Sequence, residues 1–304
     1  MSDYATSGEH RAVICTALPV EYLAVRAYLK DLREVVHPQG TIYEQGKFSA
    51  PDISWQVRIV EIGAGNANAA LETERALSDF APHVVCFVGV AGGLKDVQLG
   101  DVVAATKVYG YESGKADKSF LTRPEVGNST HRMVQRARAE ARKDDWLDRL
   151  KSSPSAKPHV FVAPIAAGEK VLSSTRVATW NFLKQHYGDA LAVEMEGYGF
   201  MRSAQANHSV EALIIRGISD LVYNKTEADA HKFQEIASAH ASAFAFEVLA
   251  KLAGTEFADI QQQQKTQPSS SSSGSRFNNQ IQGNIGKFFQ GDHAIITIND
   301  KEEK

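Results

Sequence analysis

The stretch "HVVCFVGVAGG", residues 83–93, is a run of apolar and β-branched residues that ends in two glycines. A short apolar run closed by a turn signal is typical of a buried β-strand. Six further runs of this kind occur along the chain, and most of them end in Gly, Ala or Asp. They are "RAVICTAL" (11–18), "WQVRIVEIG" (55–63), "DVVAATKVYG" (101–110), "HVFVAPIAAG" (159–168), "LAVEMEG" (191–197) and "EALIIRGISD" (211–220).

Helical patterns lie between several of these runs, most clearly over residues 66–80, 129–151, 174–187 and 229–252. Strands that alternate with helices predict a three-layer α/β fold, in which a twisted, mainly parallel central sheet is flanked by helices. Ligands of such folds bind at the carboxyl ends of the strands. The glycines and acidic residues of this chain gather at those ends, so we expect the functional site there.

The composition of the chain excludes several classes of function. Its 304 residues are 43% hydrophobic, enough for a sizeable core, and its net charge of −3 predicts neither a nucleic-acid partner nor an anionic membrane. We find no apolar run of about 18 residues and no signal peptide. The two cysteines, Cys15 and Cys86, lie in strand-like runs, so we expect buried free thiols and a cytoplasmic protein. No cluster of metal ligands is evident, and we expect no metal or cofactor.

The composition changes sharply after the last helical pattern. We interpret residues 1–254 as the catalytic domain, 255–275 as a polar linker and 276–304 as a short β-prone tail. The tail repeats weakly, because "IQGNIGKF" (281–288) aligns with "FQGDHAII" (289–296) at a period of eight. Such repeats could stack with copies from other chains, as in cross-β assemblies. The alternatives are a disordered tail and a strand added to a partner's sheet.

Four segments combine glycines, acidic residues and strand ends. Each alone has an ordinary explanation as a turn, a helix cap or a dipole partner. The third, however, places Glu194 and Glu196 in an apolar run, where buried carboxylates are costly without partners. The four segments are "ALPVEYLAV" (17–25), "VGVAGGLKDVQLGDVV" (88–103), "AVEMEG" (192–197) and "RGISDL" (216–221).

In these motifs the sequence resembles the purine nucleoside phosphorylase/nucleosidase superfamily, over about Val13 to Leu252. Within it, the 5′-methylthioadenosine/S-adenosylhomocysteine nucleosidases are the most similar branch. The resemblance implies the fold of that superfamily and a homo-oligomer, either a dimer or a larger assembly. It also implies hydrolysis of the N-glycosidic bond of an adenine nucleoside or nucleotide, with release of adenine.

The resemblance also implies roles for individual residues. Asp220 would be the acid that protonates the purine, kept neutral by burial, and an aspartate there resembles the branch that handles adenine. Glu196 would bind the ribose hydroxyls and stabilise positive charge on the sugar, and Glu21 would position the attacking water. We expect Glu194 to be paired within the protein. The implied substrate-binding residues are Met195, Ser219, Arg216, Val171, Leu172, Ala91 and Gly92.

Two positions beside the glycine-rich turn bear on the choice between water and phosphate. Related bacterial phosphorylases carry an Arg and a Ser there, whereas this chain has Phe87 and Val90. An apolar pair cannot hold a phosphate dianion, so the sequence favours hydrolysis. A purine nucleoside phosphorylase remains the alternative.

Basic residues near the motifs bear on the 5′ substituent of the substrate. Lys170, Lys225 and Arg123 could bind a 5′-phosphate, although an ordinary solvated loop explains each of them as well. A long chain with an added tail resembles the nucleosidase domains of immune-type proteins, some of which degrade ATP. We therefore keep three alternatives: a regulated defence effector that degrades ATP or AMP, a housekeeping nucleosidase, and a non-catalytic nucleotide sensor that signals through the tail.

Overall fold

The computed structural model describes residues 10–117, 120–172, 178–207, 209–222 and 230–252. The chain divides into two compact units, residues 1–263 and 264–304, and all described residues belong to the first. The predicted linker and tail therefore lie outside the described residues.

A mixed sheet forms the centre of this unit, in the order β11-β10-β6-β12-β5-β1-β4-β3-β2, with β9 paired to β6. All seven predicted strands are present in it, and β2, β3 and β9 are additional. The strands are β1 (His10–Thr16), β2 (Lys30–Val36), β3 (Ile42–Ala50), β4 (Ile53–Glu61), β5 (Val84–Gly93), β6 (Val102–Gly110), β9 (Glu125–Asn128), β10 (Val160–Ala167), β11 (Ala192–Glu194) and β12 (Glu211–Leu221).

The sheet has as many antiparallel as parallel pairings in its described part, five of each, so a mainly parallel sheet is not confirmed. At one edge, β2, β3 and β4 follow one another through short turns, which makes neighbours antiparallel. At the other, β11 runs antiparallel to the end of β5, and this pairing closes the ring β5-β12-β6-β10-β11. The carboxyl ends of β5 and β12 consequently meet the short strand β11 at one rim.

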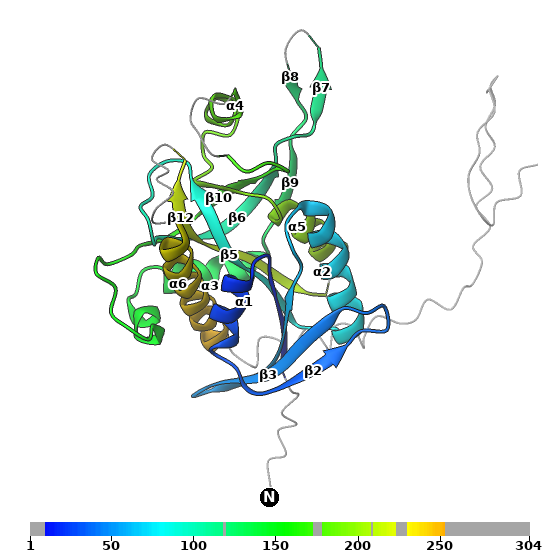
Figure 1. Cartoon of the computed structure of the whole chain (residues 1–304), viewed down its shortest axis with the longest axis vertical. Coiled ribbons are helices and arrows are strands. Elements are labelled where there is room, and N and C mark those ends of the chain that lie inside the picture. Colours follow the sequence, from blue (N-terminus) through cyan, green and yellow to red (C-terminus); the bar gives the residue numbers. More distant parts are fainter. Residues whose placement is uncertain (1–9, 118–119, 173–177, 208, 223–229, 253–304) are drawn as a thin grey trace, which may run out of the picture. The chain divides into compact units, whose positions relative to one another are not determined.

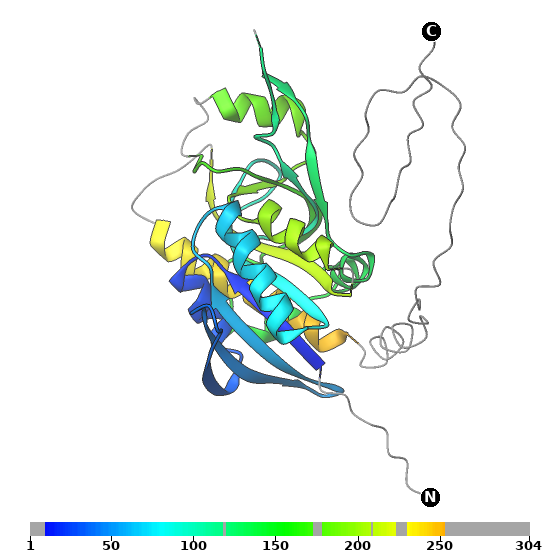
Figure 2. The ribbon, with the colours of Figure 1, turned by 90° about the vertical axis from the view of Figure 1, so that its right-hand side faces the viewer.

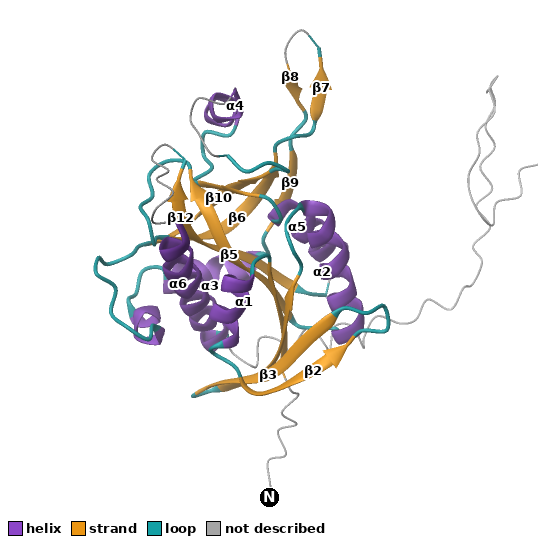
Figure 3. Cartoon of the chain, in the orientation of Figure 1, coloured by secondary structure: helices purple, strands orange, loops and turns teal. Residues whose placement is uncertain are grey.

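Helices cover both faces of the sheet (Figures 1 and 3). On one face α6 packs against β12 and β5 with α1 and α3 beside it, while α2 and α5 pack together on the other face. The hairpin of β7 (Gly114–Ala116) and β8 (Phe120–Thr122) projects from the main sheet (Figure 1). None of the described helices is long and apolar enough to cross a bilayer. The helices are α1 (Pro19–Arg26), α2 (Asn66–Phe80), α3 (His131–Glu140), α4 (Ala178–His186), α5 (Gly197–Ala206), α6 (Ala230–Lys251) and the 3₁₀ helix η1 (Asp145–Arg149).

The single helix predicted over residues 129–151 is wrong. The α-helix ends at Glu140, and a separate 3₁₀ turn follows. This turn buries Trp146, whose ring meets Phe244 of α6 edge-on at 6.1 Å between centroids. Burial of a large aromatic side chain outweighs the modest helix propensity of the sequence before it.

The two faces of the sheet carry two separate apolar layers, one under α1, α3 and α6 and one under α2 and α5. Figure 2 shows α2 and α5 side by side on one face of the sheet. The alanine-rich α6 approaches β12 so closely that a Cβ on Gly217 would lie 2.1 Å from the carbonyl oxygen of Ala237. Trp55 of β4 donates its indole N–H to the Leu249 carbonyl, 3.1 Å away, near the other end of α6. These contacts set the position of β12, which carries part of the functional site.

We expect Gly217→Ala to destabilise the fold, because the added methyl would meet backbone that cannot move without shifting α6. Overpacking of this kind costs about 1–3 kcal/mol, and here we expect the upper end. Gly188→Ala is the matched control, since its Cβ would lie 3.1 Å from one carbonyl on an exposed turn and should cost under about 1 kcal/mol. Urea unfolding of both variants measures the difference, and equal midpoints would contradict the close packing of β12 on α6.

Candidate active site

A cavity of about 310 Å³ opens at the rim where β5, β11 and β12 end. It brings together side chains from all four segments singled out in the sequence. Arg216 lies behind the cavity wall. The predicted residues that line the cavity are Glu21, Glu196, Asp220, Met195, Ser219, Val171, Leu172, Ala91, Gly92 and Lys170.

Arg216 on β12 is fully buried and holds three carboxylates together. Its Nη2 forms ion pairs with Glu194, at very short range, and with Glu196 at 3.3 Å. Its Nη1 lies 3.9 Å from Glu21 Oε1, and the Phe87 ring packs 4.1 Å below the guanidinium carbon. A buried charge needs compensating partners, so each carboxylate has a reason to be buried where it is. Burial alone would lower the pKa of Arg216, but the carboxylates raise it, and the guanidinium stays charged.

Glu21 is fixed by backbone as well as by charge. Its Oε2 accepts hydrogen bonds from the N–H groups of Ala17 (2.7 Å) and Leu18 (3.0 Å), and its Oε1 accepts one from Val90 (2.8 Å). The residue lies in the first turn of α1, where a carboxylate is favoured by the helix dipole. Burial nevertheless raises the pKa of Glu21, against the opposing effects of Arg216 and the three N–H donors.

The sequence suggested that Glu194 and Glu196 lie on one regular strand, but they do not. The strand β11 ends at Glu194, and Glu196 is the residue that precedes α5. Glu194 accepts hydrogen bonds from the N–H groups of Glu196 (3.1 Å) and Gly197 (2.8 Å), so it is paired within the protein, as predicted. Burial raises the pKa of Glu194 to about 7; Arg216 opposes this and Glu196 adds to it. Glu196 Oε1 accepts from the N–H of Gly65 at 3.1 Å.

A β-bulge on β12 presents Asp220 to the cavity. Ile218 pairs with Ala91 and Asp220 with the next residue, Gly92, so Ser219 is the extra residue. Bulges re-aim side chains and are common beside active sites. A Cβ on Gly92 would lie 2.9 Å from Asp220 Oδ1, so a glycine is needed for the carboxylate to lie against the turn.

The turn between β4 and α2, "GAGN" (63–66), was missed by the sequence analysis. Ala64 lines the cavity, and the N–H of Gly65 reaches Glu196. Gly63 and Gly65 have φ values of +72° and +100°, which side-chain-bearing residues rarely adopt. Two glycines spaced by one residue at the carboxyl end of a strand were the signal that could have revealed this turn.

The three basic residues considered for a 5′-phosphate differ in position. Lys170 lines the cavity, with its Nζ 3.4 Å from Glu112. Arg123 is exposed at the end of the β7–β8 hairpin and is not among the described lining residues. Lys225 lies outside the described residues.

Acidic groups predominate among the charged side chains of the described cavity walls, whose other residues are mostly apolar. Four carboxylates line it, from Glu21, Glu194, Glu196 and Asp220, against Lys170 in the wall and the guanidinium behind it. Such a field stabilises positive charge that develops inside the cavity. The carboxylate oxygens can also accept hydrogen bonds from hydroxyl groups or from a water molecule.

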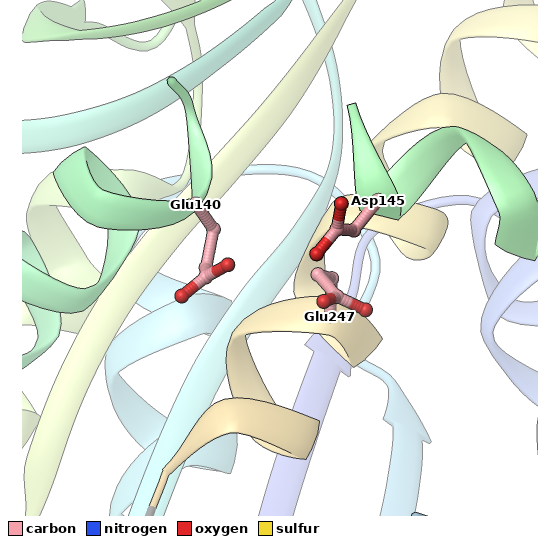
Figure 4. A group of neighbouring side chains, drawn as sticks. All are labelled: Glu140, Asp145 and Glu247. Atoms are coloured by element: carbon pink, nitrogen blue, oxygen red, sulfur yellow. The ribbon is translucent and has the colours of Figure 1, made fainter. Parts of the chain in front are cut away.

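A second acidic group lies elsewhere, where Glu140, Asp145 and Glu247 bring carboxylate oxygens within 4.8 Å of one another (Figure 4). Sequence reasoning missed it because the three come from α3, η1 and α6. Basic side chains already neutralise these oxygens, so we interpret the group as an ion-pair network rather than a metal site. Those side chains are Arg136, Lys143, Arg149 and Lys251.

The chain belongs to the phosphorylase superfamily, whose family model matches residues 11–252. A 5′-methylthioadenosine/S-adenosylhomocysteine nucleosidase from Colwellia psychrerythraea, solved in complex with adenine, superposes with a TM-score of 0.68 at 20% identity. The match covers 81% of this chain and 97% of that one, and it shows a shared fold.

Two curated relatives are named for different substrates. The ATP nucleosidase Cap17 of Escherichia coli is 31% identical over 196 residues, which is 58% of this chain but 38% of the relative. This chain therefore spans about two fifths of that protein's length. A 5′-methylthioadenosine/S-adenosylhomocysteine nucleosidase from Mycobacterium bovis is 28% identical over 237 residues, covering 73% of this chain and 89% of the relative.

We expect Arg216→Met to destabilise the fold by about 3–5 kcal/mol, because it leaves three buried carboxylates without their cation. For a domain of this size the melting temperature should fall by about 10 °C. The loss should shrink as the pH drops from 8 to 5, since protonation removes the repulsion. Arg26→Gln is the control, because the exposed pair of Arg26 with Glu44 should contribute under about 1 kcal/mol. Calorimetry at several pH values measures both, and a pH-independent loss would contradict this account.

Proposed function

We propose that this chain hydrolyses the N-glycosidic bond of adenine nucleosides or nucleotides and releases adenine. The observation that carries the proposal is the cavity in which Glu21, Glu196 and Asp220 meet, with Arg216 behind them. Relatives named as nucleosidases, both for ATP and for methylthioadenosine, support the same reaction class.

Each carboxyl group has a distinct task in this reaction. Asp220 donates a proton to N7 of the purine as the bond between N9 and C1′ breaks, so the leaving base is neutral. Glu196 accepts hydrogen bonds from the ribose hydroxyls and stabilises the cationic sugar. Glu21 accepts a proton from water as the water oxygen bonds to C1′. Arg216, buried behind these groups, opposes protonation of Glu21 and so helps to keep it available as the base.

The surroundings of Arg216 favour water over phosphate. The guanidinium faces three carboxylates, and its flat side is covered by Phe87. A phosphate dianion would meet those negative charges, while Val90 offers its backbone N–H to Glu21. A phosphorylase remains the less favoured alternative.

The 5′ substituent decides between the two enzymatic alternatives. A defence effector that degrades ATP or AMP is supported by the Cap17 relative and by Lys170 at the cavity. A housekeeping nucleosidase is supported by the longer match to the mycobacterial relative and by the acidic described walls. A non-catalytic nucleotide sensor is the third reading, and the intact set of three carboxyl groups argues against it.

We further propose that the chain is organised in three parts. Residues 1–254 would form the catalytic domain, 255–275 a linker and 276–304 a tail for self-assembly or partner docking, as the composition suggests. The enzyme would act as a homo-oligomer. A reducing cytoplasm suits Cys15 and Cys86, both buried free thiols.

Chromatographic assay of free adenine tests the function. Wild-type protein should release adenine from at least one of ATP, AMP, methylthioadenosine and S-adenosylhomocysteine without phosphate. Asp220→Asn should lower kcat by about 10²–10⁴-fold with binding retained, because the amide cannot donate the same proton. Asp96→Asn, at a largely exposed side chain near the same turn, is the matched control and should leave kcat unchanged. A strict need for phosphate, or full activity of Asp220→Asn, would overturn the proposal.

The raised pKa of Glu21 predicts how activity depends on pH. Below that pKa, Glu21 carries a proton and cannot accept one from water, so kcat/KM should fall as the pH drops through it. We expect the midpoint of this acid limb above 4.5, the ordinary glutamate value. The pH profile of kcat/KM from 4 to 9 measures it, with Glu44→Gln as a control that keeps the limb. A midpoint at or below 4.5 would remove Glu21 from the role of base.

A further inference from the structure

Asn66, the first residue of α2, connects three separate segments around the cavity. Its Nδ2 donates to the carbonyl of Gly168 at 3.2 Å and to Glu169 Oε1 at 2.9 Å. Its Oδ1 accepts from the N–H of Gly199 in α5 at 2.9 Å. One amide group thus uses both ends to hold segment 168–172 and the start of α5 together.

Both connected segments carry parts of the site. Val171 and Leu172 of segment 168–172 line the cavity, and in the proposed reaction they contact the purine. The neighbouring residue in the turn, Gly65, donates its N–H to Glu196, the proposed ribose ligand. The turn 63–66 therefore binds both Glu196, the proposed ribose ligand, and segment 168–172, the proposed base-binding segment.

The packing leaves the turn little freedom to adjust. A Cβ on Gly199 would lie 1.9 Å from the carbonyl oxygen of Asn66, so α5 and the start of α2 are in direct backbone contact. Segment 168–172 has further bonds, because the N–H of Gly168 donates to the Glu194 carbonyl and that of Glu169 to Glu112. Between these bonds and the buried Leu172, residues 169–171 are exposed, with Val171 at 68%.

We infer that Asn66 is a positioning residue that sets the distance between the base-binding segment 168–172 and the ribose carboxylate Glu196. This inference rests on the proposed function, because it assigns the two segments to the two halves of one nucleoside. If the segment moves away from the base, the substrate is held less tightly before the glycosidic bond breaks, so the loss falls mainly on KM.

Asn66→Asp tests the inference with a side chain of nearly the same shape. Aspartate keeps the acceptor for Gly199 but loses the donor and places a carboxylate against Glu169 and the Gly168 carbonyl. We expect kcat/KM for the best adenine nucleoside to fall about ten- to a hundredfold, mainly through KM. Selectivity for that substrate over inosine should fall too, because the purine is no longer held against its contacts.

A second substitution tests the bond itself. In the double variant Asn66→Asp with Glu169→Gln, the amide introduced at position 169 can donate to the carboxylate introduced at position 66, so donor and acceptor are exchanged. We expect the double variant to reverse at least half of the increase in log KM that Asn66→Asp causes. Glu169→Gln alone keeps an acceptor for Asn66 and should stay within about twofold of wild type.

Asn207→Asp is the matched control for a purely structural effect. Asn207 Nδ2 also donates to a glutamate, Glu74 at 2.9 Å, and to a backbone carbonyl, that of Ser203 at 3.0 Å. This bond also joins the two helices, from the C-terminal end of α5 to the middle of α2, and neither residue is among the described residues that line the cavity. Asn207→Asp should therefore lower the melting temperature about as much as Asn66→Asp while KM and selectivity stay unchanged.

Calorimetric binding of adenine separates failure of this inference from failure of the proposed function. If wild type releases no adenine from any nucleoside, the proposed reaction fails, whatever Asn66 does. Weaker adenine binding by Asn66→Asp than by Asn207→Asp supports the positioning role even then. Equal adenine affinity, KM and selectivity in these two variants would overturn it.

Discussion

The buried guanidinium of Arg216 is the constraint on which the site depends. A charge at full burial is tolerated only with partners close by, and this one has three carboxylates, contributed by α1, by β11 and by the residue before α5. The pairing fixes three segments that are far apart in the sequence to a single point on β12. It also leaves an excess of negative charge, because one cation faces three acidic groups. Burial raises the pKa of both Glu194 and Glu21, and for Glu194 the neighbouring Glu196 carboxylate adds to this effect.

Glycines without a side chain leave the space that Arg216 and its three carboxylates occupy. A Cβ on Gly89 would lie 2.4 Å from both Arg216 Nη1 and Glu21 Oε1, so that glycine is required for the ion pairs to form. On the opposite side of β12, Gly217 allows α6 to press on the strand. The strand is thus held between a helix and a charge cluster, and the bulge at Ser219 turns its last residues into the cavity. The closure of β11 onto β5 completes the rim from the other side.

The charge cluster around Arg216 also bears on how this chain compares with its relatives. The family match spans the sheet and the charge cluster, whereas the two curated relatives are named for substrates that differ at the 5′ end. In the proposed reaction the charge cluster acts on the glycosidic bond, which those substrates share. On this proposal, residues outside the cluster decide which 5′ substituent is accepted. A polyphosphate in the described walls would face mostly carboxylates, so its charge would have to be met by other parts of the enzyme.

The local pattern of the sequence determined most of the strands, one of the helices and the motifs of the site. The strand runs, the helix over residues 66–80 and the motifs containing Glu21, Glu196 and Asp220 could all be read from the sequence, because each depends on neighbours a few positions away. The mixed, partly closed sheet, the break after residue 140 and the connection made by Asn66 could not. These depend on contacts between residues many tens of positions apart, such as the bond of Asn66 to Gly199, and on whether a buried charge or aromatic ring finds its partner. Tertiary packing decided them, because only the folded chain brings those partners within reach.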